Sequence, residues 1–172
     1  MHDSYQYIGC PPPPLPAAPL ADATQPPPDG ARPVLAVVGE EGCYREVLDR
    51  GVALAVGSGA PLHVGVLHGR SQLTTDPALV AHVNRRLGHL LQVLHADLAR
   101  HSVSGWATSV EVLSYTGSLL RSRHVAAWRA VDTLAETVRA GLVVVPWELA
   151  EVAWSQGGKD GRTLVVVANE GD

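Results

Sequence analysis

Val34-Leu35-Ala36-Val37-Val38 is a continuous apolar run, rich in β-branched valine, and Gly39 ends it. Because no polar residue alternates with the apolar ones, this run is typical of a strand that is covered on both faces of a sheet. Strands of that kind belong to parallel sheets, whose neighbouring strands are joined by crossover helices. The run therefore predicts an α/β domain.

Helical and extended patterns alternate along the chain on the C-terminal side of this run. The expected helices cover residues 43–56, 76–100, 122–140 and 148–154, and the further strands cover 62–67, 110–113, 142–145 and 163–168. Asp76-Pro77 is a typical helix start, while Gly57-Ser58-Gly59 and Gly141 are expected helix stops. This alternation predicts right-handed crossovers and a three-layer, doubly wound α/β domain with a five-stranded parallel sheet.

Composition excludes several classes of protein. The chain has 172 residues, of which 46% are apolar and 17% charged, and this is enough to build the core of one domain. A net charge of −4 gives no general attraction to nucleic acid or to an anionic membrane surface. No stretch is long and apolar enough for a transmembrane helix. Two cysteines are too few for a disulfide scaffold, so we expect a reducing, cytoplasmic location.

Proline is concentrated at the N-terminus, where ten of the thirteen prolines precede residue 34. Proline lacks a backbone donor and favours extended conformations, so this segment is unsuited to a helix or a central strand. We expect residues 1–32 to be a disordered, proline-rich tail and residues 33–172 to be the domain. The tail is either a spacer or a docking peptide for a protein partner.

In a doubly wound sheet, ligands bind beyond the carboxyl ends of the strands. The residues that follow the first, second and fourth strands are therefore the candidates for a ligand crevice. They are Gly39, Glu40, His68, Pro146 and Trp147.

A second candidate is an anion site at the start of the helix over residues 122–140. Cationic side chains beside free helix amides can hold a phosphate or a sulfate. The residues concerned are Ser118, Arg121, Arg123 and His124, and an ordinary solvated face is the alternative.

The helix over residues 76–100 carries His82, Arg86 and His89 on the face opposite its leucines. The two histidines are seven residues apart, about 10 Å along the helix, and no acidic residue or cysteine joins them at a ligand spacing. We interpret this face as a solvated stripe and expect no metal site. No set of residues forms a convincing catalytic group either, so we expect the protein not to be an enzyme.

Two stretches resemble universal stress proteins. They are the first strand–helix–strand unit, with Ser58-Gly59-Ala60-Pro61 before its second strand, and the stretch Ala140-Gly141-Leu142-Val143-Val144-Val145. The resemblance covers roughly residues 33–170. It implies strand order 3-2-1-4-5, ATP binding in some members, and homodimers paired through the last strand. The dimer edge would then consist of Leu164, Val165, Val166 and Val167.

The ATP-binding members of that family follow their fourth strand with a G-x-x-G loop, nine residues, and then G-S or G-T. Here the fourth strand continues into Pro146-Trp147-Glu148, and no glycine follows until Gly157. Gly39 stands at the position of the aspartate that contacts the nucleoside in the family. We therefore expect a member without the usual ATP site and without a cofactor, acting through protein association or a small ligand. The alternative is an ATP- or AMP-binding stress-response switch with an altered phosphate loop.

Overall fold

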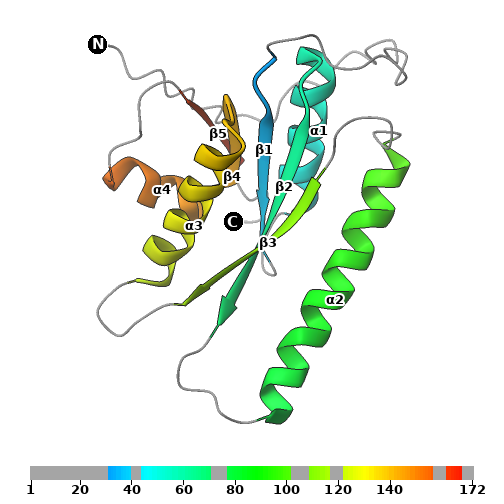
Figure 1. Ribbon diagram of the computed structural model, residues 1–172, viewed down its shortest axis with the longest axis vertical. Coiled ribbons are helices and arrows are strands. Elements are labelled where there is room, and N and C mark those ends of the chain that lie inside the picture. The colour runs from blue at the N-terminus through cyan, green and yellow to red at the C-terminus, as the bar shows by residue number, and fades with distance from the viewer. Residues whose placement is uncertain are drawn as a thin grey trace.

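The computed structural model describes residues 31–39, 44–70, 77–101, 109–116, 122–156 and 162–167. Strands and helices alternate along these residues: β1 (Val34–Val38), α1 (Tyr44–Ser58), β2 (Leu62–Arg70), α2 (Pro77–Arg100), β3 (Ser109–Thr116), α3 (Arg123–Thr137), β4 (Leu142–Pro146), α4 (Trp147–Ser155) and β5 (Thr163–Val167). The five strands form one parallel sheet in the order β3-β2-β1-β4-β5. Helices α1 and α2 cover one face and α3 and α4 the other (Figure 1). The predicted three-layer α/β fold and strand order are confirmed. The proposed boundary between tail and domain stays a prediction, because residues 1–30 lie outside the described part.

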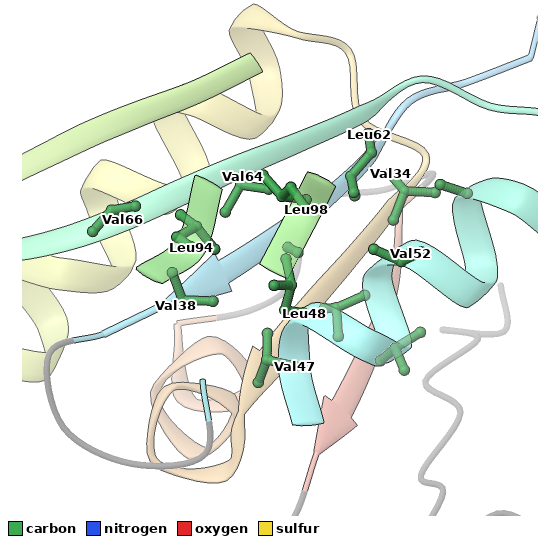
Figure 2. Packing of buried hydrophobic residues seen from close by; sticks show 14 of the residues in the cluster. Val34, Val38, Val47, Leu48, Val52, Leu62, Val64, Val66, Leu94 and Leu98 are labelled. Carbon is green, nitrogen blue, oxygen red and sulfur yellow. The ribbon is translucent and has the colours of Figure 1, made fainter. Parts of the chain in front are cut away.

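The central strand β1 contributes side chains to both hydrophobic cores, one on each face of the sheet. Val34, Ala36 and Val38 belong to the cluster under α1 and α2, part of which Figure 2 shows. Leu35 and Val37 belong to the cluster under α3 and α4. All five residues are at most 1% exposed. This double burial is the reason why β1 is apolar at every position instead of every second one.

The pair β2–β3 extends beyond the end of β1. Pairing between β1 and β2 ends at Val38↔Val66, whereas β2 continues alongside β3 to Arg70↔Thr116. Both strands are longer than the predicted segments 62–67 and 110–113. Their extra residues are largely polar, because this projecting part of the sheet is incompletely covered (Figure 1).

At the opposite, amino ends of β2 and β3, His63 Nδ1 lies 2.5 Å from Ser109 Oγ, and burial lowers the pKa of His63.

Two helices end in the same way but with different residues. After α1, Gly59 has a φ of 65° and the amide of Ala60 donates to the carbonyl of Ala55 at 3.0 Å. After α3, Arg139 has a φ of 55° and the amide of Ala140 donates to the carbonyl of Ala135 at 2.9 Å. The prediction that Gly141 stops this helix is therefore wrong. The left-handed residue stands two positions earlier and is an arginine, for which that conformation is uncommon.

Helix α2 is attached to the domain mainly by its C-terminal third. Its buried residues are Leu94, Asp97 and Leu98. Leu94 and Leu98 lie among the strand side chains of the cluster in Figure 2. By contrast, Leu79 in the first turn is 48% exposed. The first part of α2 runs beside the projecting end of β2 and β3 instead of covering the middle of the sheet (Figure 1).

The edge strand β5 is held to the domain by an ion pair as well as by the sheet. Arg162, which precedes β5, donates to Asp132 of α3 at 2.7 Å, and its second nitrogen lies 3.5 Å from Glu136. The Arg162 and Asp132 side chains are 18% and 22% exposed, so solvent weakens this pair less than it weakens a surface pair. The contact joins the start of β5 to the layer formed by α3 and α4.

Replacing Gly51 by alanine is expected to destabilise the protein by about 1–3 kcal/mol. A Cβ atom at this buried position of α1 would lie 2.7 Å from the Cβ of Ala36 in β1, so the helix would have to move away from the sheet. The matched control is Gly57→Ala in the same helix, where no heavy atom lies within 4 Å of an added Cβ. That change is expected to stabilise by about 0.5–1 kcal/mol through helix propensity. Urea unfolding of both variants measures the difference, and equal effects would contradict the close α1–β1 contact.

Candidate functional site

The point where ligands are expected in this fold is the carboxyl edge of the sheet between β1 and β4. The two strands are neighbours, but the chain leaves β1 for α1 on one face and β4 for α4 on the other. Such a topological switch opens a crevice beyond the strand ends. Gly39, half-buried, lies at the end of β1. Glu40 lies outside the described residues.

The sheet separates the other crevice candidates. His68 is 4% exposed, and its place two residues after Val66 puts it on the α1–α2 face. Trp147 is half-buried in the cluster under α3 and α4, and its ring packs edge-on against Trp154 with centroids 5.3 Å apart. His68 and Trp147 therefore belong to opposite faces of the sheet. Whether either contacts a ligand stays a prediction.

Strand β4 continues directly into α4, without a loop. Pro146 is both the last residue of the strand and the N-cap of the helix, and no side chain caps that end. Glu148 occupies the first turn of α4. The lack of a backbone N–H on proline and the negative charge of Glu148 both make this helix start unfavourable for a phosphate group. No glycine stands between Leu142 and Gln156.

The predicted anion site can be followed only in part, because Ser118 and Arg121 lie outside the described residues. The Nε atom of Arg123 donates to the Tyr115 hydroxyl at 3.0 Å, and its guanidinium also lies over the Tyr115 ring. His124 is exposed on the first turn of α3. The hydroxyl of Ser122 accepts from the amide of Val125 and caps the helix start. At least one N–H donor of Arg123 is therefore engaged by Tyr115 of the same chain.

The predicted dimer edge has its side chains inside the protein's own core. Leu164, Val165 and Val166 are 3–6% exposed, and Val167 is half-buried. β5 pairs with β4 on one side, and in the described ranges no strand pairs with its other side. What β5 can offer a partner is thus its backbone, together with the half-buried Thr163 and Val167 at its ends.

A cavity of about 450 Å³ lies between α2 and the start of α1. The lining residues are Tyr44, His82, Arg85, Arg86, His89, Leu90 and Val93. The sequence places His82, Arg86 and His89 on one helical face, but it gives no sign that this face borders a cavity. Our interpretation as a solvated stripe missed Arg85 and Tyr44, because only the fold brings the start of α1 to the middle of α2.

Tyr44 is held in place by polar contacts on two sides. Its hydroxyl accepts from Arg45 Nε at 2.9 Å and lies 3.4 Å from Asp97 Oδ2 of α2. The hydrogen bond to Tyr44 raises the pKa of Arg45. Asp97 also accepts from Arg100 at 3.0 Å, and His101 pairs with Asp49 of α1 at 2.9 Å. These contacts fix the wall of the cavity that α1 provides.

Two negative findings concern the described ranges only. They contain no cluster of three or more His, Cys, Asp or Glu side chains that could hold a metal ion. No helix in them is long and apolar enough to cross a membrane.

Comparison with known proteins gives a match in fold. No protein-family model matches the chain, and no curated protein matches it in sequence. Among solved structures, a protein of the universal stress protein family from Burkholderia pseudomallei has a TM-score of 0.59 at 16% identity, with 80% of this chain and 96% of that chain covered. The universal stress protein UspA from Lactobacillus plantarum has a TM-score of 0.56 at 12% identity, with 81% and 98% covered. The chain therefore has the fold of universal stress proteins, and the expected resemblance is confirmed at that level.

Proposed function

We propose that the protein is a non-enzymatic, cytoplasmic binding protein of universal-stress-like fold that acts by association, with β5 pairing to β5 of a second copy. This proposal rests on the composition of β5 and on its position at the edge of the sheet. The strand Thr163–Val167 contains no charge and no proline, and it lies at the end of the sheet. Proteins usually protect such edges with lysine, proline or a bulge, because unpaired backbone groups recruit other strands.

The opposite edge of the sheet differs from β5. Strand β3 exposes Glu111 and has polar residues at several positions along its length. Like charges that meet across a two-fold axis destabilise pairing, so a second copy is disfavoured there. The contrast between the edges supports β5 as the associating one. A protein partner for the proline-rich residues 1–32 stays a separate prediction.

The absence of enzymatic activity is part of the proposal. In the part of the chain that the structure describes, a serine hydroxyl and a histidine ring meet at Ser109 and His63. This pair lies at the amino ends of β2 and β3, the edge away from the switch point. A nucleophile in this fold would be expected at the carboxyl edge, with a third group orienting its base.

The competing function is an ATP- or AMP-binding switch in the β1–β4 crevice. We expect no cofactor there, because Pro146 and Glu148 replace the phosphate loop and Trp147 packs into the α3–α4 core. A thermal-shift titration with ATP and AMP, with and without magnesium, tests this expectation. The variant Arg85→Gln/Arg86→Gln is titrated beside the unmodified protein, so that a nucleotide cannot bind through the two arginines that line the cavity beside α2. No shift at millimolar nucleotide is expected in the variant. A saturable shift there would establish crevice binding and favour the switch, because a ligand of the native state raises the melting temperature by mass action.

A further inference from the structure

The basic face of α2 is exposed to solvent, and its position beside a cavity distinguishes it from an ordinary solvated stripe. The residues His82, Arg85, Arg86 and His89 recur at helical spacing and all border the cavity of about 450 Å³. None of the four forms a hydrogen bond or an ion pair in the described part of the chain. The charged groups nearer the C-terminal end of α2 behave differently, since Arg100 is paired with Asp97 and His101 with Asp49.

The local charge of α2 is unbalanced. The helix carries three arginines and a single acidic residue, Asp97. Asp97 is engaged with Arg100 and Tyr44 and is not among the residues that line the cavity. Arg85 and Arg86 therefore repel each other without a compensating carboxylate on their own helix, and an anion between them would relieve that repulsion. Both arginines line the same cavity, so an anion inside it can contact both long side chains.

The size and lining of the cavity indicate the kind of ligand. A volume of about 450 Å³ lies in the range of small-molecule sites, about 300–1,000 Å³. Leu90 and Val93 provide an apolar wall, and Tyr44 provides an aromatic ring held by its two polar contacts. Guanidinium groups match the geometry of phosphate oxygens in paired hydrogen bonds. A chain of net charge −4 is a poor match for the extended backbone of a nucleic acid.

We propose that this cavity binds a small phosphorylated molecule, with Arg85 and Arg86 on its phosphate and Tyr44, Leu90 and Val93 against its organic part. The site lies on the α1–α2 face, apart from the β5 edge and from Trp147. This proposal is independent of the proposed function. Association through β5 can fail while the cavity binds phosphate, and the cavity can fail to bind phosphate while β5 associates.

The test is isothermal titration of the full chain with inorganic pyrophosphate at constant ionic strength. Saturable binding is expected for the unmodified protein, and Arg85→Gln/Arg86→Gln is expected to weaken it by about tenfold or more. The matched control is Arg129→Gln/Arg139→Gln, which removes the same charge from exposed positions on and after α3 and is expected to bind as the unmodified protein does. Circular dichroism confirms that both variants fold.

Three outcomes of the pyrophosphate titration would overturn the proposal. They are no saturable binding by the unmodified protein, equal weakening in the two variants, and unchanged binding after substitution of Arg85 and Arg86. The second outcome would mean that only the net charge matters. If a single-stranded oligonucleotide binds more tightly than pyrophosphate in the same titration, the ligand is a nucleic acid and not a small molecule. None of these results depends on the oligomeric state.

Discussion

Replacing Leu94 by alanine is expected to destabilise the protein by about 3 kcal/mol, within the range of about 2–5 kcal/mol for buried leucines. Leu94 is fully buried and packs in the cluster under α1 and α2 (Figure 2). It is one of only two buried apolar residues in the 24-residue helix α2, the other being Leu98. Because Leu94 and Leu98 are the buried apolar anchors of α2, the substitution removes about half of this attachment in addition to apolar packing in the core.

The matched control for this prediction is Leu79→Ala in the first turn of the same helix. Leu79 is 48% exposed, so its truncation is expected to change the stability by less than about 0.5 kcal/mol. Urea unfolding followed by circular dichroism measures both variants. Similar losses for the two substitutions would mean that the first half of α2 is packed as firmly as the second half, contrary to the burial described above.

The double substitution Thr163→Glu/Val167→Glu is expected to turn a dimer into a monomer at micromolar concentration. In a two-fold antiparallel pair centred on Val165, Thr163 of one protomer lies opposite Val167 of the partner subunit. The new carboxylates would then face each other across the interface, where like charges are destabilising. Both positions are half-buried at the ends of β5, away from the three most buried residues of the strand. Size-exclusion chromatography with light scattering gives the mass.

A charge swap provides the control. Thr163→Lys/Val167→Glu places an ammonium group opposite each carboxylate in the same register, so this variant is expected to remain dimeric. Circular dichroism shows whether each variant is folded. If both variants are folded and both are dimeric, or both are monomeric, the proposed antiparallel pairing centred on Val165 is wrong.

The fold could be predicted because its signals are local. The run Val34–Val38 is apolar throughout since the sheet is covered on both faces, and the alternation of helices and strands then leaves few topologies. Strand ends were predicted less well. The polar residues at the ends of β2 and β3 lie where the sheet is incompletely covered, so they lack the apolar pattern by which strands are recognised.

The features that the sequence does not reveal depend on contacts between distant segments. Arg139 ends α3 in a left-handed conformation, although a glycine two residues later is the more obvious stop. Tyr44 reaches α2 because α1 and α2 cover the same face of the sheet, and a sequence separation of 53 positions between Tyr44 and Asp97 hides that contact in the sequence. The positions of His68 and Trp147 on opposite faces follow from the pleat and the crossovers, not from their shared place after strand ends.

The most direct test of the proposed function is sedimentation equilibrium of the unmodified full chain over a range of micromolar concentrations. Association through β5 predicts a reversible species of twice the 18.1 kDa chain mass, whose fraction rises with concentration. A single species of 18.1 kDa at every concentration would contradict the proposal that the protein acts by pairing with a second copy.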